Sequence, residues 1–404
     1  MARFELVVVG GGMVGMTLIA ALQPAIEQGL GVTLIDPAPQ PEQRLPASPS
    51  FDGRATALSA QALQVFSALK MAHFEQALSN IQAIEVSDRG QAGLLQLHAR
   101  EMGFQRFGAV IANADLGALL WQKIHSLPVH WRFNSHAAKL TPQPNGQSVT
   151  LSDGTHLHAD LVILCDGGRS KLHESLGFSL QENSFQAVAR VASLTTAKAH
   201  QGKAFERFTE LGPIALLPFG QASTLVWTVP QNRIDTLPNS PATAIPWLEK
   251  SFGQRLGRIT GLSDWSEYPL IERQMATACS HGFLALGNAA ATLHPVAGQG
   301  FNLALRGLAR SANLINSQYH QDRHLPTFSQ LNDVATTIAR DQTKTAGVSR
   351  ELIRLFQSSA PLLRWGRGLG LNSLDRHPSL AQGVALTGMG LLEDVPVLAP
   401  AYAT

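Results

Sequence analysis

Residues 5–22 read ELVVVGGGMVGMTLIAAL, and this stretch decides the fold. An apolar, β-branched run predicts a buried strand, a glycine-rich turn follows it, and the apolar run after the turn predicts a helix. A second buried run, VTLID at residues 32–36, completes a strand–turn–helix–strand unit with the length of a dinucleotide-binding crossover. The sequence therefore predicts an α/β protein built on a Rossmann-type parallel sheet.

The turn fits the pattern G-x-G-x-x-G through Gly10, Gly12 and Gly15. In this pattern the first glycine permits a tight turn, the second lets a pyrophosphate approach the backbone, and the third lets the helix pack on the strand. Asp36 follows about 20 residues after Gly15, where an acid accepts ribose hydroxyls. The glycine pattern alone is weak in a chain with 35 glycines, so its flanking strand and helix carry the prediction. Since an acid disfavours a 2′-phosphate, we expect FAD or NAD rather than NADP at this site.

Two further stretches contain candidate ligand-binding residues. DLVILCDGGRS at residues 160–170 predicts a buried strand that ends at Asp166 and Gly167, where α/β sheets bind ligands; an ordinary β-turn is the alternative. Residues 50–70 predict a helix with Arg54 near its start. The helix dipole disfavours a cation there, so either Arg54 is simply solvated or it reaches an anionic cofactor.

The stretch GNAAATLHPVAGQGFNLALR at residues 287–306 predicts a strand end, a structured turn and the start of a helix. Its glycines let something flat or anionic approach the backbone at a helix N-terminus. His294 lies inside this stretch, and the other histidines are scattered without metal-ligand spacing.

The remaining segments predict a second unit. Residues 178–267 alternate like an antiparallel sheet with a helix at 241–252, which indicates a domain inserted into the first. Residues 83–97 predict a hairpin, residues 113–126 a helix capped by Asn113 or Asp115, and residues 327–392 a helical tail.

Composition excludes several classes of function. The net charge is +2 and no Lys/Arg cluster is dense enough for nucleic acid, so no nucleic-acid partner is expected. We expect buried, reduced thiols at the two cysteines, a cytoplasmic setting, no cleavable signal and no spanning helix. Metal-ligand motifs are missing, and so is a classical nucleophile motif, which is typical of enzymes whose cofactor carries the chemistry. Trp365, flanked by Arg364 and Arg367, either covers the core or offers a surface to a membrane or partner helix.

Three motifs together carry a family resemblance: VVVGGGMVG (7–15) with Asp36, CDGGRS (165–170), and ALGNAAATLHPVAGQGFNLALR (285–306). The chain resembles the class A flavin-dependent aromatic hydroxylases to about residue 390, and within them the methoxyphenol-hydroxylase branch of ubiquinone biosynthesis. The resemblance implies a p-hydroxybenzoate-hydroxylase-like fold, with a Rossmann-type FAD domain, an inserted, mainly antiparallel β substrate domain and C-terminal helices. It implies FAD, with NAD(P)H as transient reductant, and oxygen transfer from a C4a-hydroperoxide to a polyprenylated methoxyphenol.

The resemblance also implies domain boundaries. We expect the FAD-binding domain in residues 1–78, 103–177 and 275–340, the substrate domain in 79–102 and 178–274, and a C-terminal helical region in 341–404. Peripheral contact with the inner membrane, or association with other ubiquinone-biosynthesis proteins, would give access to the prenylated substrate.

Site residues follow by position from the resemblance. The cofactor-binding set comprises Gly10, Gly12, Gly15, Asp36, Arg54, Asp166, Gly167, Asn288, Gly298, Gln299, Gly300 and Asn302. His294 and its neighbour Pro295 are the candidates for catalysis, with His294 as base or hydrogen-bond partner of the phenol. Phe219 and Trp227 are candidates for an apolar channel that holds the prenyl tail, with ordinary core positions as the alternative.

The chain departs from the wider pattern at Asn288, Ala291, His173 and Gly307, where relatives often carry Asp, His, Arg and Asp. Two other functions stay open. The same dinucleotide unit would serve a flavin oxidase or dehydrogenase without oxygen insertion, and Asn288 and Ala291 leave open a non-catalytic flavoprotein subunit of a quinone-synthesis complex. The sequence does not decide the ring position, the tail length, NADH versus NADPH, or the oligomeric state.

Overall fold

A mixed sheet carries the glycine-rich turn at the end of its central strand in the computed structural model, which describes residues 4–41, 50–253, 255–292, 299–357, 361–391 and 397–399. The strand order is β19-β20-β12-β1-β2-β8, and β1 runs parallel to both β2 and β12. This order confirms the predicted Rossmann-type crossover. The strands are β1 (Glu5–Val9), β2 (Gly31–Ile35), β8 (His130–Arg132), β12 (Leu161–Leu164), β19 (Cys279–Ser280) and β20 (Phe283–Ala285).

Both faces of this sheet are covered, because its strands are apolar on both sides. Leu6 and Val8 of β1 pack against helices, whereas Val7 and Val9 pack against a small antiparallel sheet. The helices are α1 (Met13–Ala21), α2 (Gln23–Glu27), α4 (Asn113–Ile124) and α7 (Gln299–Asp322). The small sheet consists of β9 (Ala137–Gln143), β10 (Gly146–Leu151) and β11 (His156–Ala159).

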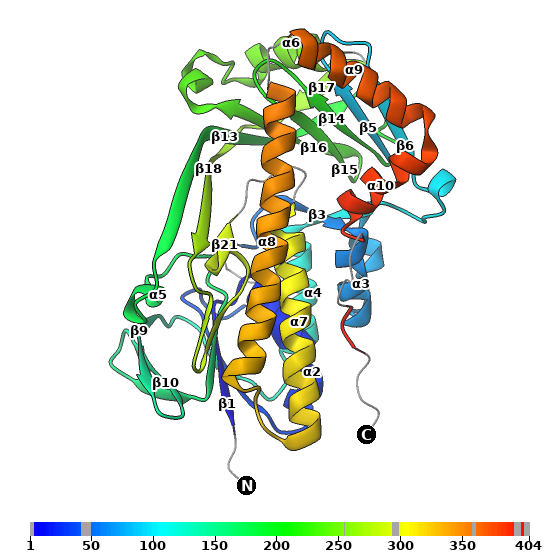
Figure 1. Ribbon diagram of the computed structural model, residues 1–404. Helices are drawn as coiled ribbons and strands as arrows, with labels where there is room; N and C mark the ends of the chain where they lie inside the picture. The colour runs from blue at the N-terminus through cyan, green and yellow to red at the C-terminus, as the bar shows by residue number, and fades with distance from the viewer. Residues whose placement is uncertain are drawn as a thin grey trace.

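A larger sheet lies above the first in Figure 1 and has the order β21-β18-β13-β16-β15-β14-β5-β6, with β17 paired to β13. Its pairings are antiparallel except that of β14 with β5. Helix α6 (Pro241–Phe252) packs on one face, within the predicted bounds. The strands are β5 (Ala83–Asp88), β6 (Leu94–His98), β13 (Leu180–Thr196), β14 (Lys203–Phe208), β15 (Ile214–Phe219), β16 (Ala222–Pro230), β17 (Ile259–Leu262), β18 (Ser266–Met275) and β21 (Ala291–Thr292).

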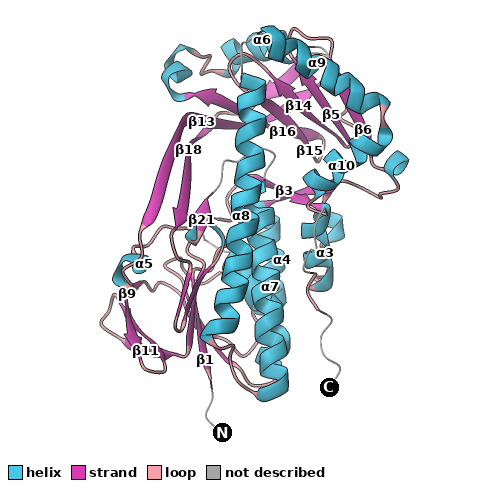
Figure 2. Cartoon of the chain, viewed as in Figure 1, coloured by secondary structure: helices cyan, strands magenta, loops and turns pink. Residues whose placement is uncertain are grey.

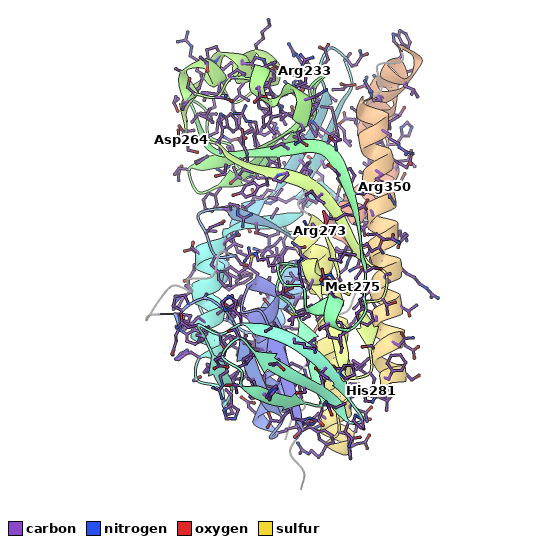
Figure 3. The ribbon with its side chains drawn as sticks, turned by 90° about the vertical axis from the view of Figure 1, so that its left-hand side faces the viewer. Arg233, Asp264, Arg273, Met275, His281 and Arg350 are labelled. Atoms are coloured by element: carbon purple, nitrogen blue, oxygen red, sulfur yellow. The ribbon has the colours of Figure 1, made fainter. Side chains whose placement is uncertain are left out.

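Three long elements join the two sheets. Strands β13 and β18 run side by side from the upper sheet to the lower one, and α8 (Phe328–Gln357) spans the same distance (Figure 1). An ion pair between Arg350 Nη1 of α8 and Glu272 Oε2 of β18, at 3.7 Å, ties the helix to this strand pair; Figure 3 labels Arg350.

Helices α9 (Pro361–Arg376) and α10 (Pro378–Met389) complete the predicted helical tail (Figure 2). Helix α9 follows the edge strand β6: Asn372 Oδ1 accepts a hydrogen bond from the Leu94 N–H, and Asp375 Oδ1 accepts one from the Gln96 N–H. The edge of the sheet is thereby closed to pairing with another chain. No helix among the described residues is both long and apolar enough to cross a membrane.

The predicted helix at residues 50–70 is wrong in its first half. Residues Ala55–Ser59 form strand β3, which pairs with β7 (Gly108–Ala112) and lies beside β4 (Ser79–Ile81), and only then does α3 (Ala60–Ala68) begin. The alanine-rich composition favours a helix locally, but strand pairing across about 50 residues outweighs that weak preference. Ser59 caps α3, because its side chain accepts a hydrogen bond from the Ala62 N–H.

The predicted cap of α4 is wrong as well. Ala112 is the cap residue, and no side chain caps this helix among the described residues. Asn113 instead accepts a hydrogen bond from Thr56 Oγ1 at 2.6 Å, which fastens α4 to β3.

Candidate cofactor and active site

Three loops meet at the carboxyl ends of β1, β12 and β20. A Cβ placed on Gly10 would lie 2.6 Å from the Cys165 carbonyl oxygen, and a Cβ on Gly168 would lie 2.8 Å from the Asn288 carbonyl oxygen. Both distances are shorter than real Cβ contacts, so only glycine allows these backbones to approach each other. The predicted motifs at residues 10–15, 165–170 and 287 onward are thus brought together at one edge.

The glycine-rich turn leads directly into α1. A Cβ on Gly15 would lie 1.9 Å from the Gly10 carbonyl oxygen, so the helix packs on the strand only because residue 15 lacks a side chain. Gly12 is the cap residue of α1, no described side chain caps this helix, and its first turn contains no acid. The N–H groups at the start of α1 are therefore suited to an anion such as a pyrophosphate.

Asp36 follows β2 and is 5% exposed. Its Oδ2 accepts a hydrogen bond from the Gly11 N–H, and its Oδ1 accepts one from the Ala38 N–H at 2.8 Å. A carboxylate offers about four acceptor positions, so the same side chain can hold the turn and still accept a ribose hydroxyl.

Asp166 organises the turn after β12. Its Oδ1 accepts a hydrogen bond from the Gly168 N–H at 2.9 Å, and its Oδ2 accepts one from the Ser170 N–H at 2.8 Å. Gly167 and Gly168 both have φ +74°, a conformation that favours glycine. Asp166 therefore shapes the loop that lies against Gly10.

The thiols at this edge of the sheet are not reactive groups. Burial and then the neighbouring Asp166 charge raise the pKa of Cys165. Burial raises the pKa of Cys279 to about 11. Since only the thiolate is nucleophilic, neither cysteine serves as a nucleophile at neutral pH. The described part of the chain also contains no cluster of three or more His, Cys, Asp or Glu side chains that could hold a metal ion.

Arg54 lies at the junction between β3 and the larger sheet. Its Nε donates to Asp52 Oδ1 at 2.8 Å, and its guanidinium carbon lies 4.9 Å from the ring centroid of Tyr268 on β18. Burial raises the pKa of Asp52, but the hydrogen bonds and the charge of Arg54, together with a bond from Asn113, lower it overall. Sequence reasoning missed Asp52 and Tyr268. Asp52 stands two positions from Arg54, whereas no sequence signal indicated Tyr268.

The stretch after β20 packs between two helices. Gly287 has φ +60°, and a Cβ there would lie 3.0 Å from Val14 Cγ2 of α1 and 3.5 Å from Ala304 Cβ of α7. Asn288 is exposed, so its side chain is accessible to a ligand. The candidates His294, Pro295 and Gly298 lie outside the described residues.

Helix α7 begins at Gln299, and Asn302 in its first turn is buried. Asn302 Oδ1 accepts a hydrogen bond from the Ser59 N–H at 2.9 Å, and its Nδ2 donates to the Ala57 carbonyl at 3.0 Å. The Asn302 side chain therefore fastens the start of α7 to β3. Gly300 is different, because no described residue lies within 4 Å of a Cβ placed there.

These features fit FAD: an uncapped helix start after a glycine turn, a buried acid at the ribose position and a second helix start where no described residue crowds Gly300. The FAD binding domain family matches residues 3–321 of the sequence. The chain belongs to this family. FAD is accordingly its cofactor, as the sequence predicted.

Relatives in sequence agree with this membership. The chain is 29% identical over 394 residues to ubiquinone hydroxylase UbiL of Rhodospirillum rubrum, covering 96% of this chain and 90% of that protein. It is 27% identical to 3-demethoxyubiquinol 3-hydroxylase of Escherichia coli, covering 96% of this chain and 98% of that protein.

The fold is similar to that of p-nitrophenol 4-monooxygenase PnpA from Pseudomonas putida. The TM-score is 0.77 at 15% identity, covering 98% of this chain and 100% of that one. This likeness confirms the predicted p-hydroxybenzoate-hydroxylase-like fold.

The two predicted channel residues lie on opposite faces of the larger sheet. Trp227 is fully buried on the α6 side, where its ring stacks on Trp247 at 4.3 Å. Trp227 is paired with Ile214 of β15, so both side chains point to the α6 side. Phe219 is five residues further along β15, and because successive residues alternate between faces, its side chain projects from the other face. The structure therefore does not support Trp227 as a channel residue. Phe219 remains a candidate.

The face of the sheet opposite α6, which we call the inner face, is mostly apolar, and part of it packs against a cluster that includes residues of α9 and α10. Along β15, the side chains that point toward α6 are buried, whereas the side chains that alternate with them and point to the inner face are partly exposed. Tyr268, which Arg54 contacts, also lies on this face. It is paired with Ala189, which stands two residues before the inner-face residue Val191 on β13 and so points the same way. The half-buried apolar residues of the inner face are Ile84, Val86, Val191, Ala215, Leu217, Phe219 and Val226.

Proposed function

We propose that this protein is an FAD-dependent monooxygenase that hydroxylates the ring of a polyprenylated methoxyphenol in ubiquinone biosynthesis. The observation that carries this proposal is the inner face. Its half-buried apolar side chains suit an aromatic ring with a prenyl tail. Contacts link it to the cofactor end of the fold: Tyr268 touches Arg54 at the start of β3, and Asn302 holds β3 against the start of α7.

FAD, when bound, supplies the redox chemistry: it accepts electrons from NAD(P)H and activates O₂ for transfer of one oxygen atom to the ring. The protein's own groups bind and orient. The N–H groups at the start of α1 would hold the pyrophosphate, and Asp36 a ribose hydroxyl. Asn288 would bond a hydroxyl of the ribityl chain, and Arg54 would reach the diphosphate.

The start of α7 would serve the reactive end of the site. Its N-terminal N–H groups, at Gly300 and its neighbours, favour negative charge because they form the positive end of the helix dipole. Apolar side chains on the inner face exclude water from the ring. His294, with Pro295 beside it, stays a candidate for the group that bonds the phenol.

We also propose a peripheral contact between α9–α10 and the membrane that dissolves the prenylated substrate. Five of the described large apolar side chains on these helices are exposed: Leu363 (44%), Trp365 (70%), Leu369 (58%), Leu380 (57%) and Val384 (43%). Trp365 and Leu369 are four residues apart and so share one face of α9. Of the two arginines beside Trp365, Arg367 points inward and pairs with Asp88 at 2.8 Å, so its charge is not available to lipid headgroups.

Turnover with a short-chain prenylated methoxyphenol tests the function. Purified holoenzyme, NADPH and O₂ should give a hydroxylated product by mass spectrometry. Oxidised but unhydroxylated product would support the oxidase or dehydrogenase alternative. Flavin-loaded protein that never consumes NADH or NADPH, with or without the phenol, would support the non-catalytic subunit.

A further inference from the structure

Glu206 on β14 lies in an otherwise apolar cross-strand row. On one side it pairs with Ala215 of β15, which pairs with Val226 of β16, which pairs with Val191 of β13. On the other side it pairs with Val86 of β5. Directly paired residues of neighbouring strands point to the same face of a sheet. Glu206 therefore places a carboxyl group among the apolar side chains of the inner face.

The neighbouring residues of β14 confirm which way Glu206 points. Phe205 is buried on the α6 side, where its ring meets that of Phe252 at 5.4 Å. Arg207 also points to that side, since its Nε donates to the Ser251 carbonyl of α6 at 2.8 Å. Successive residues of a strand alternate between faces, so Glu206 projects from the inner face.

The side chain of Glu206 has no hydrogen bond or ion pair with any residue that the structure describes. Burial raises its pKa to about 7. A half-buried carboxyl without a partner is unfavourable, and natural proteins retain such groups where function requires them.

Other charged groups near Glu206 do not account for its raised pKa, which burial causes. On β5, Asp88 is paired with Phe208, two residues along from Glu206, and the Arg367 guanidinium of α9 neutralises it at 2.8 Å. Glu85 lies on the opposite face with Arg255 and Lys203. The segments of β15 and β16 in this row, IALLPF and ASTLVWTVP, contain no charged residue.

We propose that Glu206 is a catalytic residue that accepts the proton of the substrate's ring hydroxyl. This inference rests on the proposed function. The phenolic O–H bond breaks, a new O–H bond forms on the Glu206 carboxylate, and the electron pair stays on the phenolate oxygen. No oxidant or further reactant is needed for this step. The ring gains electron density and becomes a better acceptor of an electrophilic oxygen atom.

Glu206 matches this role better than an ordinary carboxyl. A phenol has a pKa of about 10 and an unperturbed glutamate one of about 4.3, too far apart for efficient transfer. A base with a pKa near the operating pH combines availability with driving force. The apolar row on both sides of Glu206 would hold the ring and exclude water.

The test compares the wild-type holoenzyme with Glu206→Gln and a matched control, Glu210→Gln, an exposed carboxyl in the same hairpin. In the wild type, kcat should rise with pH through an apparent pKa near 7. In E206Q it should be lower by about 100-fold or more, since positioned bases contribute about 10² to 10⁴. E206Q should also lose the rise near pH 7 while keeping its FAD content, and E210Q should match the wild type.

A fluorinated substrate with a more acidic phenol should recover most of the E206Q defect, because it needs no base. An E206Q enzyme with wild-type kcat and pH profile would overturn the proposal for Glu206 alone. A wild-type enzyme that never hydroxylates the phenol would instead overturn the proposed function.

A second test of Glu206 as the base uses only the wild-type holoenzyme and so does not depend on whether E206Q folds. Ultraviolet difference spectra of the phenol bound to wild-type holoenzyme at pH 8 should show the phenolate band. A bound phenol that stays protonated at pH 8 would also overturn the proposal.

Discussion

The guanidinium carbon of Arg54 lies 4.9 Å from the centre of the Tyr268 ring, and this contact joins the cofactor end of the fold to the larger sheet. Arg54 immediately precedes β3, which Asn302 fastens to α7, and Tyr268 belongs to β18, one of the long strands between the sheets. Asp52 holds the arginine in place through a hydrogen bond at 2.8 Å. Arg54, which the sequence predicts to bind the cofactor, therefore also contacts the larger sheet.

Removing this contact should weaken cofactor binding and catalysis together. Tyr268→Leu should weaken FAD binding by a few-fold, because partly exposed cation–π contacts contribute about 0.5–2 kcal/mol. Tyr268→Phe should bind FAD almost as the wild type does. Flavin fluorescence titration measures both. Arg323→Ala, which removes a distant Arg–Tyr pair at 5.7 Å, is the control and should leave FAD affinity unchanged.

Gly15→Ala should be severely destabilising. The added Cβ would lie 1.9 Å from the Gly10 carbonyl oxygen, so α1 must move away from β1. We expect a loss of about 3 kcal/mol or more in the free energy of unfolding, at the upper end of overpacking. Gly53→Ala is the matched control, since no residue that the structure describes lies within 4 Å of its added Cβ. Urea unfolding compares them, and equal midpoints for the two variants would contradict the packing described for α1.

Stability should depend on pH through Glu206. Burial raises its pKa to about 7 in the folded chain, above the roughly 4.3 of the unfolded chain, so the folded state binds the proton more tightly. Its stabilising contribution is full below about pH 4.3 and is lost as the pH rises through about 7. We expect the loss to be about 1–2 kcal/mol after allowance for partial exposure.

Glu206→Gln should abolish this part of the pH dependence. The difference in unfolding free energy between wild type and E206Q, measured in urea at pH 5 and pH 8, should shift in favour of the variant at pH 8. A difference that is the same at both values would show that burial does not perturb Glu206.

Membrane contact should depend on the exposed face of α9. In vesicle flotation with phosphatidylcholine and phosphatidylglycerol, the double variant Trp365→Ser/Leu369→Gln should lose most of the bound fraction. The control variant Phe328→Ser removes an apolar side chain that is 47% exposed at the start of α8, and its vesicle-bound fraction should stay at the wild-type level. If all three proteins float equally, or none does, α9 is not a lipid-binding surface.

Local patterns made much of the fold predictable. The glycine turn between two apolar runs predicted β1, α1 and β2, because all the determinants lie within about 30 residues. Helix α6 was predicted with its observed bounds, since Ser240 caps it, Pro241 begins it and Gly253 follows it. The predicted hairpin at residues 83–97 is confirmed by the antiparallel pairing of β5 with β6, two strands that are neighbours in the sequence.

Long-range pairing made the rest unpredictable. Strand β3 has a helical composition and becomes a strand only because β7 pairs with it. Arg54 and Tyr268 meet across more than 200 residues, with no local signal in either segment. The face of the sheet to which Trp227 points depends on the register in which β16 pairs with β15, and this register cannot be predicted from the sequence of either strand. The base proposed on β14, Glu206, emerged only when that register assigned the faces.

Turnover under ¹⁸O₂ tests the central claim most directly. Purified holoenzyme, NADPH and a short-chain prenylated methoxyphenol should give a product whose new hydroxyl carries one ¹⁸O atom, with none incorporated from H₂¹⁸O in ordinary O₂. A product that is oxidised without label, or labelled from water, would contradict the assignment of this chain as a monooxygenase.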